Sequence, residues 1–76
     1  MKLSDMVSNM TIQGNIRISV WAKDLAGFEN ERVLFEQKNV DSLSWSDLDE
    51  KWEDWEVNYL FTPGDGYLHI ELTEED

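Results

Sequence analysis

The chain has 76 residues, of which 41% are hydrophobic and 12% aromatic, and its formal net charge at pH 7 is -11. This apolar content exceeds that of a disordered acidic tail, so we expect one folded domain over residues 1–76. Without cysteine, and with no run near the roughly 20 apolar residues of a membrane span, the chain predicts a soluble cytoplasmic protein with no disulfide framework or thiolate zinc site.

The first predicted element is a short helix that ends near Met10. Four apolar residues recur at the i, i+3, i+4, i+7 spacing of one helical face: Leu3, Met6, Val7 and Met10. Ser4 and Asp5 suit the start of this helix, as capping residues or as partners of the positive dipole end.

Two strands connected as a hairpin are expected next. Residues 15–21 alternate, so Ile16, Ile18 and Val20 face one way and Arg17, Ser19 and Trp21 the other. Residues 32–37 are rich in strand-favouring types, with Val33 and Phe35 expected on the buried face. Between them, residues 23–30 mix charges with Gly27 and Asn30, which predicts a loop of about eight residues.

Residues 41–55 predict a second helix. Large apolar residues recur there at the i, i+3, i+7, i+10 spacing of one helical face: Trp45, Leu48, Trp52 and Trp55. Ser44 followed by Asp47 approximates a capping box, in which a hydroxyl and a side-chain acceptor three residues later satisfy free amides.

The remaining residues predict a second hairpin. Residues 55–61 and 68–72 alternate, and the turn-forming residues 63–66 separate them. The expected register pairs Phe61 with Leu68, Tyr59 with Ile70 and Val57 with Leu72. The result is an α+β fold of order αββαββ, with a four-stranded antiparallel sheet, two short helices on one face and a frayed acidic tail at residues 73–76.

No catalytic apparatus is recognisable, and we expect the protein not to be an enzyme. His69 is the only histidine, there is no cysteine, and no serine lies in a Gly-x-Ser-x-Gly elbow. His69 is expected either as a partly exposed surface residue or as a metal ligand assisted by Glu71 or by an acid of the 23–31 loop. One imidazole with carboxylates makes a weak transition-metal site, and no other cofactor is indicated.

The charge is concentrated in the second half of the chain. Residues 1–40 hold five acids and five bases, whereas residues 41–76 hold twelve acids and one base. Six of these acids fall within ten residues: Asp47, Asp49, Glu50, Glu53, Asp54 and Glu56. On a helix with its tryptophan stripe turned inward, they would face solvent at one charge per roughly 2.5 Å, close to the ~1.7 Å of duplex DNA. Two interpretations stay open, namely solubility alone or a face that engages a basic groove; direct binding of nucleic acid is disfavoured because phosphates would be repelled.

The chain resembles small proteins encoded by phages and prophages of Gram-positive bacteria. The resemblance rests on a short N-terminal helix followed by GNIRISVW, then VLFEQKNVDSLSWSDLDEKW and a closing hairpin EVNYLFTPGDGYLHIEL. Some small acidic proteins of this kind are anti-CRISPR proteins that inhibit the RNA-guided DNA nuclease of type II systems. Together with the charge distribution, this resemblance implies a stoichiometric inhibitor in the host cytoplasm that mimics DNA and blocks DNA loading. It would present the acidic helix, with Glu74 to Asp76 as auxiliaries, to a basic channel. Trp21 or Tyr67 would serve as an aromatic anchor.

Two other functions remain open at this point. One is a structural or accessory phage protein that forms a homodimer through a sheet edge or through a face containing Trp21, Leu34 and Leu60. The other is a small metal-binding protein centred on His69. The sequence does not decide the oligomeric state.

Overall fold

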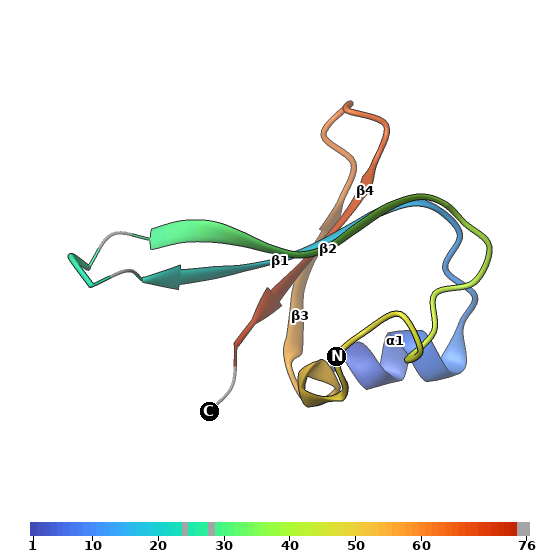
Figure 1. Ribbon diagram of the computed structural model, residues 1–76, viewed down its shortest axis with the longest axis horizontal. Coiled ribbons are helices and arrows are strands. Elements are labelled where there is room, and N and C mark those ends of the chain that lie inside the picture. Colours follow the sequence, from blue (N-terminus) through green and yellow to red (C-terminus); the bar gives the residue numbers. More distant parts are fainter. Residues whose placement is uncertain (24, 28, 75–76) are drawn as a thin grey trace.

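The computed structural model describes residues 1–23, 25–27 and 29–74, and Figure 1 shows their arrangement. Its elements are α1 (Leu3–Asn9), β1 (Gly14–Lys23), β2 (Glu29–Val40), the 3-10 helix η1 (Glu50–Trp52), β3 (Glu56–Phe61) and β4 (Leu68–Thr73). The fold is α+β, as predicted. No helix in the described part of the chain is long and apolar enough to cross a membrane.

The four strands form one mixed sheet in the order β2-β1-β4-β3. Both hairpins are antiparallel, but the central strands β1 and β4 run parallel, from the pair Ile16–Leu68 to the pair Val20–Leu72. The prediction of an all-antiparallel sheet is therefore wrong. Local turn signals specify each hairpin, whereas the central pairing depends on contacts between distant segments. It places the fully buried Ile18 and Ile70 side by side at the centre of the sheet.

One face of the sheet carries the hydrophobic core. Helix α1 and residues 41–55 cover this face, and Figure 1 shows α1 and η1 together at the lower end of the molecule. The core consists of buried side chains from the sheet and from both covering segments: Leu3, Met6, Ile12, Ile16, Ile18, Val40, Leu43, Leu48, Trp55, Ile70 and Leu72. The core is thus assembled from both halves of the chain.

Helix α1 begins as predicted, with Asp5 in the capping role. The Asp5 carboxylate accepts a hydrogen bond from the Lys2 N–H at 3.0 Å. Two amides in the first turn of α1 bond to a distant part of the chain. The Leu3 N–H donates to the Trp55 carbonyl at 2.9 Å, and the Ser4 N–H donates to the Glu53 carbonyl at 3.0 Å. These bonds attach residues 53–55 to the start of the helix.

The predicted second helix is absent, and successive turns and η1 stand in its place. The backbone bonds here join residues three apart, such as Asp47 N–H to the Ser44 carbonyl and Trp55 N–H to the Trp52 carbonyl. Serine and aspartate side chains compete for backbone amides, and crowded carboxylates destabilise a helix by repulsion. The helix predicted from apolar spacing is therefore wrong, because spacing takes no account of these two effects. The apolar side chains nevertheless pack inward, and Leu48 and Trp55 are buried.

The register of β2 differs from the expected one at Leu34. Ile18 pairs with Phe35 but Ser19 pairs with Val33, so Leu34 is an extra residue in a bulge. Leu34 and Phe35 pack against the core, whereas Val33 lies on the other face and is 42% exposed. The expectation that Val33 is buried is therefore wrong, because a bulge interrupts strict alternation.

A bulge at Asn58 changes the pairing of β3 with β4. Val57 pairs with Leu72 as predicted, but Tyr59 then pairs with Glu71 and Phe61 with His69. The predicted pairs of Phe61 with Leu68 and Tyr59 with Ile70 are wrong by one residue. Because a shift of one residue turns each side chain to the opposite face, Tyr59 and Phe61 leave the core side.

The first hairpin is longer and its connection shorter than predicted. The strands continue to Lys23 and Glu29, and the ribbon that they form projects away from α1 in Figure 1. Polar residues suit an exposed two-stranded ribbon as well as a loop, so composition did not distinguish them.

The start of the predicted tail is also ordered. Thr73 ends β4, and Glu74 forms an ion pair with Arg32 at 3.1 Å. Residues 75–76 of the predicted tail lie outside the described residues.

Candidate functional site

The acidic segment, residues 47–56, takes its local shape from hydrogen bonds made by its side chains. The Asp49 carboxylate accepts from the Lys51 N–H at 3.0 Å and caps η1, and the Ser44 hydroxyl donates to the Asp47 carboxylate at 3.2 Å. Such contacts favour tight turns over a continuous helix. The charge spacing calculated for a helix therefore does not apply, and the carboxylates follow a compact series of turns.

The acidic segment is fixed to the rest of the molecule at both ends. Leu48 is 8% exposed and Trp55 is 6% exposed, and the Trp52 and Trp55 rings lie with their centroids 6.4 Å apart. After Trp55, the Val57 N–H donates to the Met1 carbonyl at 2.7 Å. The inward tryptophans leave the carboxylates in solvent. Glu56 is half-buried, and the other five acidic residues of the segment are exposed: Asp47, Asp49, Glu50, Glu53 and Asp54.

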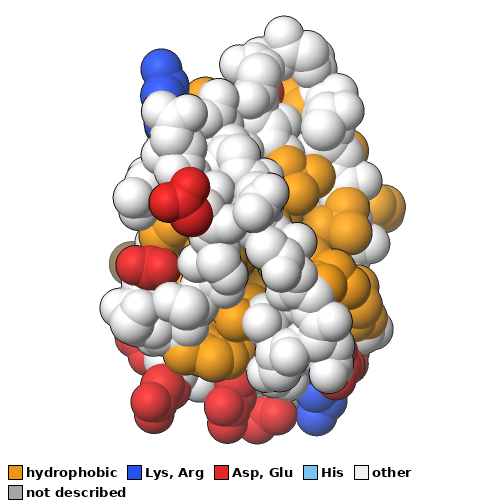
Figure 2. Space-filling view, turned by 90° about the vertical axis from the view of Figure 1, so that its right-hand side faces the viewer, with side chains coloured by type: hydrophobic (Ala, Val, Ile, Leu, Met, Phe, Trp, Pro, Cys, Tyr) orange, Lys and Arg blue, Asp and Glu red, His pale blue; other side chains and the backbone are white. Residues whose placement is uncertain are grey.

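Three of the six carboxylates have ion-pair partners. Glu56 meets the N-terminal ammonium at 3.0 Å, Asp54 meets Lys2 at 3.5 Å and Asp49 meets Lys51 at 3.6 Å. Asp47, Glu50 and Glu53 form no ion pair within residues 1–23, 25–27 and 29–74. Exposed ion pairs contribute only about 0–1 kcal/mol each, so a partner can displace them cheaply. Figure 2 shows acidic side chains gathered at the lower end, where α1 and η1 lie in Figure 1.

Trp21, the predicted aromatic anchor, lies on the other side of the sheet. It follows Val20, whose side chain is fully buried on the core face, and Trp21 is 47% exposed on the opposite face. The acidic segment packs against the core face. The structure therefore does not bring Trp21 together with the acidic segment, and the predicted site separates into two surfaces.

His69 is buried and paired, which contradicts its expected surface position. It is 7% exposed, its Nε2 lies 2.7 Å from the Asp65 carboxylate, and its ring lies 5.0 Å from that of Phe61. The Asp65 carboxylate also accepts from the Tyr67 N–H at 2.9 Å. This bond and the His69 contact lower the pKa of Asp65 below its usual value, because both favour the ionised form. Asp65 lies four residues before His69, and the sequence predicted it only as a turn residue.

The structure gives His69 a different partner from Glu71, the predicted second ligand. The two side chains lie on the same face of β4, but the His69 contact is with Asp65 in the preceding turn. Among the residues that the structure describes, no group of three or more His, Cys, Asp or Glu side chains could hold a metal ion.

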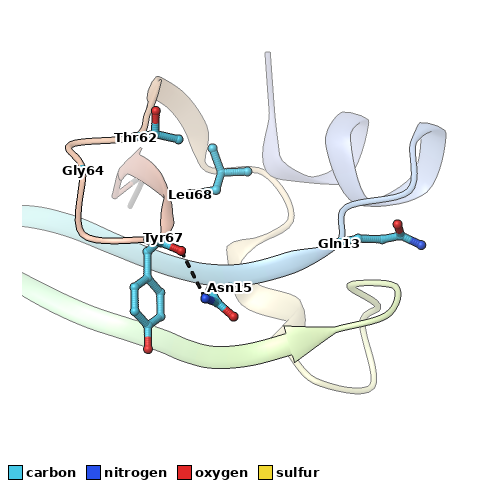
Figure 3. A pocket seen from close by; sticks show the side chains of 7 residues that line it. Gln13, Asn15, Thr62, Gly64, Tyr67 and Leu68 are labelled. Carbon is cyan, nitrogen blue, oxygen red and sulfur yellow. Dashed lines mark hydrogen bonds between the residues drawn. The ribbon is translucent and has the colours of Figure 1, made fainter.

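A shallow hollow of about 450 Å³ lies between the β3–β4 turn and the start of β1, and Figure 3 shows it. The Asn15 amide donates to the Gly66 carbonyl at 3.1 Å and accepts from the Asn39 N–H at 3.0 Å. Gln13 points away from the other labelled residues in Figure 3. The lining contains no acidic, basic or histidine side chain: Gln13, Asn15, Thr62, Gly64, Gly66, Tyr67 and Leu68. This hollow therefore offers no set of groups for acid–base or nucleophilic chemistry.

No protein-family model matches the chain, and searches of curated proteins and of solved structures find no match either. Functional inference therefore depends on the two exposed surfaces, the acidic segment and the uncovered face of the sheet.

Proposed function

We propose that this protein is a non-enzymatic binding protein that presents the acidic segment to a basic, nucleic-acid-binding surface of another protein. The observation that supports it is a set of exposed carboxylates on a backbone held by Leu48, Trp55 and the bonds to α1. A segment that is already ordered loses little conformational entropy on binding. Its excess negative charge would accelerate association with a basic surface. High salt would screen this attraction and slow the association.

The partner we propose is the RNA-guided nuclease of a type II CRISPR system, in the cytoplasm of a bacterial host. Such a nuclease holds its guide–target duplex in a positively charged channel and contacts mainly the backbone. An anionic protein surface seated in that channel would occupy the place of DNA and prevent its loading. The resemblance to phage-encoded anti-CRISPR proteins supports the same partner, and the chain would then act as an anti-CRISPR inhibitor of phage origin.

The test is a charge reversal of the three unpaired carboxylates, Asp47→Lys, Glu50→Lys and Glu53→Lys together. These side chains are exposed and form no ion pair in the described structure, and the one hydrogen bond lost, from Ser44 to Asp47, is exposed to solvent, so we expect an unchanged circular dichroism spectrum. The concentration needed to inhibit target-DNA cleavage by a guide-loaded type II nuclease should rise at least about tenfold, which corresponds to about 1.4 kcal/mol of binding free energy.

A matched pair of single variants separates local charge from net charge. Glu53→Lys and Asp41→Lys each change the net charge by +2, and each replaces an exposed carboxylate that forms no ion pair with the described residues. Asp41, however, lies outside the acidic segment. Glu53→Lys should weaken inhibition more than Asp41→Lys, and added salt should reduce that difference. Full inhibition by the triple variant, or equal effects of the two single variants, would remove the acidic segment from the mechanism.

A further inference from the structure

The second face of the sheet is left uncovered by α1 and by the acidic segment. Four large apolar side chains stand exposed on it: Trp21 at 47%, Val33 at 42%, Tyr59 at 62% and Phe61 at 42%. The strand pairings place them on one face, because Val33 is opposite Ser19, Tyr59 is opposite Glu71 and Phe61 is opposite His69. We call this surface the open face. Aromatic side chains of this kind are typical of contact surfaces.

One carboxylate of the open face has no partner among the described residues. Arg17, a cation on this face, already forms an ion pair with Glu31, and its Nε lies 3.6 Å from the Glu36 carboxylate. The Glu71 carboxylate forms no hydrogen bond or ion pair with the described residues, although Glu71 is half-buried. It lies between Tyr59 on β3 and Ser19 on β1, and Trp21 is the next residue on that face of β1. An unpaired carboxylate is thus flanked by two exposed aromatic rings.

We propose that the open face docks a partner protein through an arginine side chain that stacks on Tyr59 and pairs with Glu71. A planar guanidinium can lie on an aromatic ring and donate to a carboxylate at the same time, which an ammonium does less well. Cross-strand neighbours stand about 4.5–5.5 Å apart at Cβ, within reach of one such group. The unneutralised Glu71 supplies the charge complementarity.

A second copy of the chain is a poorer occupant of the open face. Each copy carries a net charge of -11, so two copies repel each other. The edge strands β2 and β3 are interrupted by register shifts, β2 at Leu34 and again between Gln37 and Val40, and β3 at Asn58, and such irregular edges resist pairing with another strand. The same net charge disfavours nucleic acid.

This inference extends beyond the proposed function, because the open face and the acidic segment lie on opposite sides of the sheet. Either surface can bind without the other. Failure of the arginine contact would leave the acidic segment's mechanism intact, and the reverse also holds.

The experiment is a titration of the isotope-labelled protein, followed by amide NMR shifts, with a short peptide that carries one arginine between leucines. Two comparison peptides carry lysine or citrulline in its place. We expect shifts at Trp21, Tyr59 and Glu71, and an affinity for the arginine peptide at least about threefold above that for either other peptide. Glu71→Gln should lower the affinity about fivefold, and Tyr59→Ala about two- to fivefold.

The matched control is Glu53→Gln, which removes one carboxylate from the acidic segment and should leave the affinity for the arginine peptide unchanged. Tyr59 is 62% exposed, so its replacement should not disturb folding, and circular dichroism checks this. Shifts confined to residues 47–56, equal binding of the three peptides, or undiminished binding by Glu71→Gln would each overturn the proposal. So would a dimer, found by light scattering, whose interface shifts cover the open face without peptide.

Discussion

Replacement of Trp55 by alanine tests whether the tryptophans of the acidic segment hold it in place. Trp55 is 6% exposed and lies next to Trp52 in the core. A buried tryptophan removes about 150–250 Å² from water, and at about 25 cal/mol per Å² this is about 4–6 kcal/mol, in line with the roughly 3–5 kcal/mol measured for such truncations. At about 0.05–0.15 kcal/mol per residue, a chain of 76 residues has a total stability of about 4–11 kcal/mol. Trp55→Ala should therefore remove a large part of the free energy of unfolding.

The assay is urea unfolding followed by circular dichroism, with Trp21→Ala as the matched control. Trp21 is 47% exposed, so its replacement removes about half as much buried area and should cost about 2–3 kcal/mol, roughly half the cost of Trp55→Ala. Hydrogen exchange adds a local measurement, because the Leu3 and Ser4 amides donate to the carbonyls of Trp55 and Glu53. These two amides should lose protection in Trp55→Ala. If the two tryptophan variants unfold at the same urea concentration, or if both amides stay protected, the acidic segment is not held by Trp55.

Two smaller predictions concern Asp65, in the turn between β3 and β4, and Asn39, near the end of β2. Asp65→Asn should destabilise the protein near neutral pH. Because the pKa of Asp65 is lowered in the folded protein, the ionised carboxylate stabilises the fold fully above the ordinary pKa of 3.8, and this stabilisation is lost as pH falls through the folded pKa. In thermal unfolding, the difference in melting temperature between wild type and Asp65→Asn should therefore shrink in that acid range. Asn39 has a φ of 56°, so Asn39→Val should cost about 1–2 kcal/mol in urea unfolding, whereas Asn39→Gly should change stability little. Equal costs for the two Asn39 variants would show that the left-handed backbone at this position carries no strain.

Much of the local structure could be predicted from the chain because local signals were strong and agreed with one another. The spacing of Leu3 and Met6 predicted α1, and the alternation around Ile18 and Ile70 predicted β1 and β4. The inward packing of Trp55 was predicted correctly even though its helix was not, because burial follows from hydrophobicity in either backbone conformation. The solvent exposure of the acids of residues 47–54 follows from the same cause.

The remaining features depended on contacts between segments that are distant in the chain. The parallel pairing of β1 with β4 joins residues about fifty positions apart, and no local pattern distinguishes it from an antiparallel alternative. The bulges at Leu34 and Asn58 decided which aromatic side chains face solvent, because one extra residue turns every later side chain to the opposite face.

By itself, then, the sequence determined the composition of the two surfaces, which are a run of acids on a tryptophan-rich segment and a set of strand aromatics. Only the tertiary structure decided that these surfaces lie on opposite sides of the sheet, that Arg17 contacts Glu31 and Glu36, and that the Glu71 carboxylate has no partner among the described residues. The physical reason is that hydrophobicity and backbone preference act on each segment locally, whereas the neighbours of a charge depend on how distant strands pair.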